Sequence, residues 1–176
     1  KDDLVYVVLD KSPFYAEAGG QVGDVGTLSC GDCELEIIGT FKRWDMHIHR
    51  ARLVRGDLAA ARSALFLAAV DRSTRNHTMR NHTATHLLQA ALKHVVGSQV
   101  SQQGSYVGPE RLRFDFTHHQ GVSRDELRQI EDMVNKVIQD NIVVATAIMP
   151  FADAKASSAV AQFGEKYGDE VRVLQV

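Results

Sequence analysis

Two histidines, His82 and His86, stand four residues apart in the segment NHTATHLL, residues 81–88. If this segment is a helix, positions i and i+4 lie nearly above one another, so that two imidazoles can bind one metal ion. The protease version of this pattern, H-E-x-x-H, carries a glutamate that acts as the general base. Thr83 occupies that position here, which excludes the protease chemistry. The alternative to a metal pair is two polar histidines near the start of a helix, each satisfied by hydrogen bonds.

The other histidines lack this geometry. His77 precedes His82 by five residues, about 140° around a helix, and therefore cannot share a metal with His86 through that helix. Structural or surface roles are predicted for the rest: His47, His49, His94, His118 and His119. A catalytic zinc usually takes three protein ligands and a structural zinc takes four. Either no metal binds, or the remaining ligands lie beyond Val176.

The two cysteines of the chain, Cys30 and Cys33, flank a Gly-Asp pair. A zinc finger needs about 12 residues between its cysteine pair and its histidine pair, and His82 is much farther away. Gly-Asp between two β-rich runs is typical of a tight turn. We therefore expect the cysteines to face each other at the end of a hairpin, with a cross-strand disulfide or an adventitious metal as the alternative.

Composition places the chain among ordinary globular proteins. Of its 176 residues, 44% are hydrophobic and 24% are charged, and the net charge is −2. There is no global basic signature for nucleic acid, so that a polyanion would have to meet a local basic patch. No apolar run has the length of a membrane span, and no secretory leader is visible. The chain begins KDDLVYVVLD without an initiator methionine, and we expect it to be an excised part of a longer protein.

The first part of the sequence predicts strands. Short β-branched and apolar runs are separated by Gly and Asp turns; they cover residues 4–10, 25–29, 34–41, 47–53 and 64–71. Strands of this length and spacing favour a small barrel or sandwich. One loop, residues 12–24, has the sequence SPFYAEAGGQVGD. Its Gly19 and Gly20 can adopt positive φ and allow close approach to the backbone, although a tight bend explains them equally well.

The second part changes period. Residues 72–96 have apolar side chains at helical spacing, and Gly97 fits a helix stop. Alternating strands are predicted in QVSQQGSYV and RLRFDF. A second helix follows, opened by a Ser123–Glu126 capping box. The pattern ends with a strand up to Pro150, a short helix and a last strand, EVRVLQV. It indicates an α+β fold, with a small β-barrel subdomain over 1–71 followed by a two-layer α+β core over 72–176.

Four segments together resemble the editing region of alanyl-tRNA synthetases: SPFYAEAGGQVGDVG, RNHTATHLLQAAL, QQGSYV and RLRFDF. They occur in the order and spacing of that family, and the resemblance spans nearly the whole chain. Freestanding alanyl-tRNA editing proteins share it in part, and the editing core of the family is related to that of threonyl-tRNA synthetases. A small β-barrel followed by an α+β editing core is the fold that the resemblance implies.

The resemblance implies a zinc ion held by His82 and His86 together with a later C-x-x-x-H segment. That segment normally follows a strand resembling VRVLQV, so that the site is expected to be incomplete and the core truncated within residues 72–176. ATP would serve only the parent synthetase, because the aminoacylation core is not among these motifs. Without an acidic residue beside the histidines, a metal that positions the substrate, with an ordered water as nucleophile, is the more natural mechanism.

The activity implied is hydrolysis of the ester that joins serine or glycine to the acceptor end of tRNA(Ala). A pocket built for alanine cannot strongly exclude glycine or serine, because such differences are worth about 1–3 kcal/mol. The matching positions are Gln21, Thr85 and Gln102 for catalysis and selection, and Gly19, Gly20, Gly104 and Ser105 for substrate binding. The alternative is a non-catalytic module of the same fold that binds tRNA or a partner protein. We expect a cytoplasmic or organellar protein without a membrane partner, whose parent oligomerises through other regions.

Overall fold

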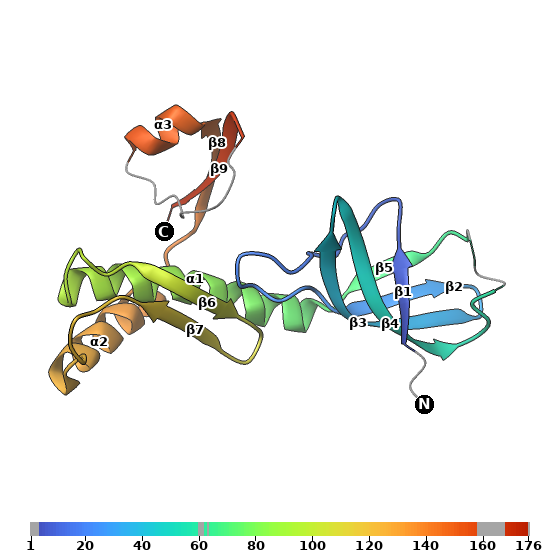
Figure 1. The fold of residues 1–176 in the computed structure, drawn as a ribbon, viewed down its shortest axis with the longest axis horizontal. Helices are drawn as coiled ribbons and strands as arrows, with labels where there is room; N and C mark the ends of the chain where they lie inside the picture. The colour runs from blue at the N-terminus through green and yellow to red at the C-terminus, as the bar shows by residue number, and fades with distance from the viewer. Residues whose placement is uncertain (1–3, 60–61, 63, 158–167, 176) are drawn as a thin grey trace. The chain divides into compact units, whose positions relative to one another are not determined.

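The structure is a computed structural model that describes residues 4–59, 62, 64–157 and 168–175 (Figure 1). Its internal contacts divide the chain into two compact units, Lys1–Val134 and Asn135–Val176. Both contain helices and strands or parts of them, so the mixed α/β character predicted from the sequence is confirmed. The domain boundary predicted between residues 71 and 72 does not coincide with the division after Val134, and it stays a prediction.

An antiparallel five-stranded sheet in the order β1-β4-β3-β2-β5 opens the first unit. Its strands are β1 (Leu4–Val8), β2 (Gly26–Cys30), β3 (Cys33–Arg43), β4 (Met46–Arg55) and β5 (Leu67–Val70). One face is covered by a core cluster that consists of Phe14, Leu28, Leu35, Ile37 and Ala51. The five apolar runs of the sequence therefore form strands as predicted.

The predicted closed barrel is wrong. Closure requires the two edge strands to pair, and in the described residues β1 pairs only with β4 while β5 pairs only with β2. β5 is only four residues long and leads to Asp71, which caps the following helix. The chain thus leaves the sheet at this edge and the sheet stays open. At the β2–β3 turn, Cys30 and Cys33 are paired opposite each other as free thiols, which confirms the hairpin expected from Gly-Asp.

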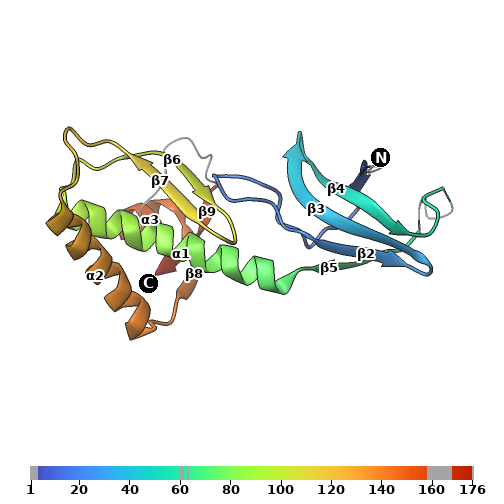
Figure 2. The ribbon, with the colours of Figure 1, turned by 90° about the horizontal axis from the view of Figure 1, so that it is seen from below.

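Helix α1 (Arg72–Val95) continues from β5 (Figure 2). It begins at Asp71, whose Oδ1 accepts a hydrogen bond from the Thr74 amide at 2.7 Å. An aspartate at this position satisfies one of the amides that the first turn leaves unpaired. The predicted helix over residues 72–96 is therefore confirmed, and it carries both His82 and His86.

A hairpin of β6 (Gln102–Val107) and β7 (Leu112–Phe116) lies alongside α1 (Figure 2). Beneath it is a second core cluster that consists of Ala91, Leu92, Val100 and Ile130. Ile130 belongs to α2 (Arg124–Asp140), which begins with the predicted capping box: the Ser123 amide donates to Glu126 Oε2 at 2.7 Å. These elements fix the positions of α1 and β6 relative to each other.

The second unit contains β8 (Ala145–Pro150), α3 (Phe151–Ala156) and β9 (Glu170–Gln175). β8 and β9 pair antiparallel, with Ala145 opposite Gln175 and Pro150 opposite Glu170. Both strands and the short helix were predicted from the sequence. None of the helices in the described residues is long and apolar enough to cross a membrane.

Candidate functional site

The Gly-rich loop, residues 12–24, is bound to strand β6 through backbone hydrogen bonds. The Val107 amide donates to the Gly20 carbonyl at 2.8 Å, and the Val22 amide donates to the Val107 carbonyl at 3.0 Å. Gly20 has a φ of +83°, and a Cβ atom at this position would lie 2.5 Å from the Ser105 carbonyl oxygen. Only glycine has this freedom without a steric cost. The positive φ expected at Gly19 and Gly20 is therefore present and brings the loop backbone against β6, whereas close approach of a ligand to these glycines stays a prediction.

Between these two backbone contacts, Gln21 reaches α1. Its Oε1 accepts a hydrogen bond from Nδ1 of His82 at 2.5 Å, and only 9% of the Gln21 side chain is exposed. An imidazole that donates through Nδ1 in its neutral form has its lone pair on Nε2. The amide therefore orients the ring and leaves Nε2 as the atom that can bind a cation or a substrate proton.

The rings of His82 and His86 lie side by side, with centroids 5.2 Å apart and planes at 20°. Both side chains are exposed to solvent, and His82 has the hydrogen bond that the alternative, two polar histidines without a metal, also expects, so the choice between the two stays open. Partial desolvation lowers the pKa of both rings, and the neighbouring His82 charge lowers that of His86 further. A neutral imidazole is the form that binds metal ions, so the pair fits two positions of a zinc site.

A third ligand is not found among residues 4–59, 62, 64–157 and 168–175. No group of three or more histidine, cysteine or acidic side chains in these ranges could hold a metal ion. The described part of the chain thus supplies two metal ligands on one helix, and the zinc ion predicted from the sequence stays a prediction.

Thr85 and Gln102 lie on different elements, Thr85 on α1 and Gln102 on β6. Thr85 is 7% exposed, and its hydroxyl donates to the Asn81 carbonyl at 2.8 Å. With its one proton committed, this hydroxyl can only accept a hydrogen bond from a substrate. Gln102 opens β6 opposite Phe116, just before a bulge that ends at Gly104. Whether these two side chains select the substrate stays a prediction.

Of the two predicted binding residues on β6, only Ser105 is seen to contact the Gly-rich loop. Ser105 donates from its hydroxyl to the Gly19 carbonyl at 3.3 Å. Gly104 faces β7, where an added Cβ atom would lie 2.9 Å from a carboxylate oxygen of Asp115. The structure therefore brings Gly19, Gly20 and Ser105 together, beside the contact that joins Gln21 to His82.

Three residues that support this arrangement were missed from the sequence. Asp24, at the end of the loop, is 6% exposed and accepts two hydrogen bonds from Arg75 of α1, one of them at 2.7 Å from Nε. Asn81, directly before His82, donates to the Gly108 carbonyl at 2.7 Å. Asp24 is the last residue of the Gly-rich loop and Asn81 the first of the histidine segment, but no local pattern identifies their partners. The Arg75 guanidinium is thereby paired with the Asp24 carboxylate.

Comparison with known proteins places these features in one family. Residues 1–72 match the family model for tRNA synthetases class II (A). The alanine–tRNA ligase of Acidithiobacillus ferridurans is 46% identical over 175 residues, which are 99% of this chain and 20% of that protein. Those of Halorhodospira halophila, 48% identical over 97% of the chain, and Bacillus pumilus, 47% identical over 99%, also match across 20% of their length.

Over this segment, the chain belongs to the alanine–tRNA ligase family. It spans about a fifth of the length of the curated relatives that it matches. The resemblance found in the four sequence motifs is thereby confirmed. The relatives match along the open sheet, the Gly-rich loop and the histidine helix alike, because the matches cover nearly every residue.

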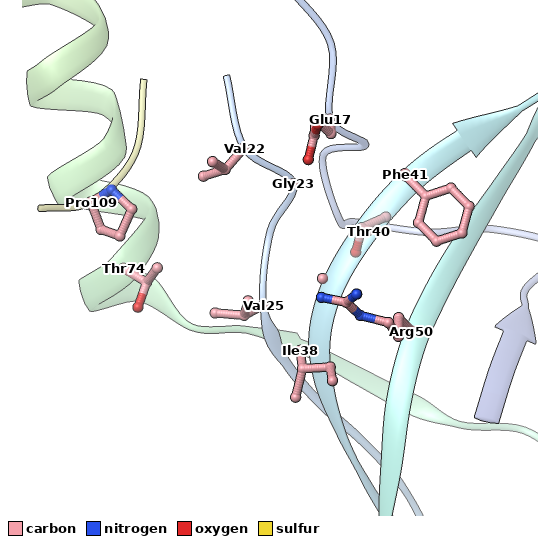
Figure 3. A pocket seen from close by; sticks show the side chains of 11 residues that line it. Glu17, Val22, Gly23, Val25, Ile38, Thr40, Phe41, Arg50, Thr74 and Pro109 are labelled. Carbon is pink, nitrogen blue, oxygen red and sulfur yellow. The ribbon is translucent and has the colours of Figure 1, made fainter. Parts of the chain in front are cut away.

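The chain also contains an open cleft beside the site (Figure 3). Its volume is about 450 Å³, within the usual range for small-ligand pockets. Phe41 and Arg50 come from the sheet, and Figure 3 shows the Arg50 guanidinium pointing into the cleft. Thr74 of α1 and Pro109 of the β6–β7 turn line the opposite side. Asn81 also donates to the Pro109 carbonyl at 3.3 Å, so that this wall is tied to the helix turn before His82.

Proposed function

We propose that this segment is the editing region of an alanine–tRNA ligase and hydrolyses seryl- or glycyl-tRNA(Ala). The observation that supports the proposal most directly is the hydrogen bond between Gln21 and His82. It joins the Gly-rich loop to the histidine helix, the two motifs that are most specific for the resemblance. Family membership supplies the tRNA, and the contact supplies a place where its aminoacylated end can bind.

The purpose of such a site follows from the energetics of amino-acid selection. A synthetase pocket that accepts alanine discriminates against a smaller side chain, or one that adds a hydroxyl, by only about 1–3 kcal/mol. A second site that hydrolyses the wrong ester raises the accuracy of charging. To be useful it must spare alanyl-tRNA, which requires groups that recognise what alanine lacks.

Thr85 has the chemistry for this selection. Its proton is donated to Asn81, so its oxygen is left to accept the hydroxyl proton of a seryl group. An alanyl methyl group would leave that acceptor without a partner. Gln102, at the start of β6, would be a second polar contact of the same pocket.

His82 and His86 are the residues that would hold a zinc ion, each through one ring nitrogen. Bound there, zinc would supply Lewis-acid attraction for the amino group or the terminal ribose hydroxyl of the substrate. The residues of the chain would do the rest. Gln21 fixes the His82 ring and still carries amide N–H donors that can bind the ester or the terminal adenosine. Gly19 and Gly20 keep the loop backbone close to β6, so that the ester would be held against an ordered water.

A non-catalytic RNA-binding module is the second candidate. It is favoured by one observation, that the described residues offer only two clustered metal ligands. The two candidates make opposite predictions for hydrolysis, because a binding module would protect the ester bond rather than break it.

The deciding experiment measures the rate at which seryl-, glycyl- and alanyl-tRNA(Ala) lose their amino acid. It uses the chain, and in parallel a complete alanine–tRNA ligase that contains it. Editing requires faster loss of serine and glycine than of alanine, with the difference abolished in His82→Ala. The matched control is His77→Ala, an exposed histidine of the same helix. Binding of tRNA with no acceleration of any of the three reactions in either protein would support the binding module instead.

A further inference from the structure

The outer face of the five-stranded sheet carries an aromatic and basic patch, which consists of Tyr6, Phe41, Arg43, Trp44 and Arg50. We propose that this outer patch binds unpaired nucleotides of an RNA strand and leads them to the cleft beside the histidines. The inference rests on the proposed function for the identity of that RNA, namely the single-stranded acceptor end of tRNA. It does not require that the chain hydrolyse the ester.

The strand register places the aromatic side chains of the patch on one face. Tyr6 of β1 lies opposite Arg50 of β4, and Arg50 lies opposite Gly39 of β3. Residues directly opposite one another project to the same side of a sheet. The rings of Tyr6 and Phe41 meet edge to face with centroids 6.3 Å apart, and Tyr6 is 64% exposed. Two neighbouring rings on an open sheet face are a platform for stacked bases.

The β3–β4 turn extends this platform with a third ring. Trp44 is 74% exposed and has a positive φ of 53°, and the Arg43 guanidinium lies 4.9 Å from its ring centroid. An exposed indole costs free energy in water, and positive φ is uncommon for a residue other than glycine. Arg43 and Trp44 together present a stacking surface beside a cation.

The charges of this hairpin select an anionic partner. Its acidic side chains face other cations: Glu34 lies 3.9 Å from Arg55, Glu36 lies 3.8 Å from Arg52, and Asp45 lies 3.8 Å from Lys42. Within the described residues, no carboxylate forms an ion pair with the two cations of the patch, Arg43 and Arg50. Unpaired arginines interleaved with aromatic rings are suited to phosphates and bases together. A protein partner would need carboxylates at the same spacing, whereas an RNA strand provides a phosphate at every nucleotide.

The outer patch is continuous with the cleft, so an RNA strand bound on the patch could run into the cleft. Phe41 and Arg50 belong both to the patch and to the lining of the cleft (Figure 3). Thr74 on the opposite side precedes His82 by eight residues, about 12 Å along the helix axis. A few nucleotides can span from the sheet face to the histidines. The patch would therefore hold the unpaired strand just before its aminoacylated end.

Binding can be measured without hydrolysis because Trp44 is the only tryptophan of the chain. The probe is an uncharged 12-nucleotide single-stranded RNA that ends in CCA, compared with a blunt duplex of the same sequence. The single strand is expected to quench Trp44 fluorescence and to bind more tightly than the duplex. The anisotropy of a labelled RNA gives the same affinity independently.

Two pairs of variants test the patch. Tyr6→Ala is expected to weaken binding about tenfold, since stacking on an aromatic side chain is lost, while Leu4→Ala on the same strand changes it less than twofold. Arg50→Gln is expected to weaken binding and to reduce the slope of log affinity against log salt by about 0.7, as loss of one phosphate contact predicts. Arg55→Gln, the same substitution on the same strand, leaves the slope unchanged. Circular dichroism confirms the fold of each variant.

The outcomes separate this inference from the proposed function. Wild-type affinity in Tyr6→Ala and Arg50→Gln, or preference for the duplex, overturns the inference, even if the chain edits seryl-tRNA. A patch covered by a protein surface would give that result, with affinities equal for all variants. Loss of RNA binding in these two variants, while their controls bind normally, supports the inference even if no hydrolysis is found.

Discussion

Gln21 and His82, 61 residues apart in the chain, are joined by a hydrogen bond of 2.5 Å. The acceptor is an amide oxygen, so that the imidazole carries its proton on Nδ1 and its lone pair on Nε2. The Gly-rich loop thus determines which nitrogen of the helix faces a ligand. A second residue that fixes a ligand's tautomer is typical of metal sites.

Gln21→Ala should reduce the affinity for zinc about 10- to 100-fold, because the His82 ring loses the acceptor that orients it. Gln21→Glu keeps an acceptor at the same place and should retain most of the affinity. Competition with a chromophoric chelator measures both. Equal loss in the two variants would indicate that the amide N–H groups, rather than Oε1, matter for the metal.

The chain itself should hold zinc weakly. Two neutral imidazoles on one helix leave the other positions of a tetrahedral ion to water. We expect purification without added zinc to give less than one zinc per chain, and His82→Ala to remove what is bound. His77→Ala is the control and should leave the content unchanged. One tightly held zinc per chain, resistant to a chelator, would reveal a ligand not recognised among the described residues.

Thr85→Val should slow the hydrolysis of seryl-tRNA by the loss of one hydrogen bond, about 0.5–1.5 kcal/mol, and that of glycyl-tRNA less. The reason is that valine removes the oxygen left to accept the seryl hydroxyl. Thr85→Ser keeps this oxygen and should retain discrimination. Deacylation rates of seryl-, glycyl- and alanyl-tRNA in an editing-competent protein measure the effect. A uniform decrease in all three rates, with metal content unchanged, would make Thr85 a general support of the site.

Arg75→Ala should destabilise the first unit by about 3 kcal/mol, since it leaves the buried Asp24 carboxylate without its cation. The hydrogen bond with Asp24 also raises the pKa of Arg75. Arg72→Ala, on the exposed first turn of the same helix, should change stability by less than about 0.5 kcal/mol. Urea unfolding measures both. Adding Asp24→Asn to Arg75→Ala should recover part of the loss, and additive losses would show that the pair is not coupled.

The free energy of unfolding should decrease in mildly acidic solution because of His49, which is fully buried. Burial lowers its pKa from the ordinary 6.5, although the hydrogen bond to the Val7 carbonyl acts in the opposite direction and nearby His47 adds to the decrease. Between the lowered pKa and about pH 6.5, His49 is therefore protonated in the unfolded chain and neutral in the folded chain. The contribution of His49 is complete above about pH 6.5 and is lost as the pH decreases from there toward the lowered pKa.

The measurement is the free energy of unfolding of the wild type and of His49→Gln between pH 8 and pH 5. The difference between the two should shrink as the pH falls below about 6.5, by at most about 1.4 kcal/mol per pH unit for a single proton. Parallel curves over the whole range would show that His49 is protonated equally in both states.

Local sequence patterns were sufficient to predict the helices and strands. They were insufficient to predict which of these elements contact one another. Leucine and alanine at helical spacing predict α1, and β-branched runs predict the strands of the sheet, because each depends on residues a few positions apart. The barrel was not predicted correctly because pairing of β1 with β5 would depend on residues about 60 positions apart, and a local periodicity carries no information on such pairs. The contact of Gln21 with His82 and that of Asp24 with Arg75 were hidden for the same reason. Family resemblance indicated His82 and Gln21 as site residues, but the hydrogen bond between them came from the structure.

The long separation of the site's parts has a consequence for the newly made chain. Ser105 and Gly19, which meet under the loop, are 86 residues apart, a length that takes roughly 4–17 s to synthesise at about 5–20 residues per second. The hairpins of the sheet have partners close in sequence and can form during this interval. The Gly-rich loop can bond to the sheet through the Glu17 amide and the Thr40 carbonyl, but the backbone of its tip at Gly20 and Val22 has no partner until β6 leaves the ribosome. Until then its glycines remain accessible to proteases and chaperones, so the loop that orders the site would be among the last parts of the nascent chain to become protected.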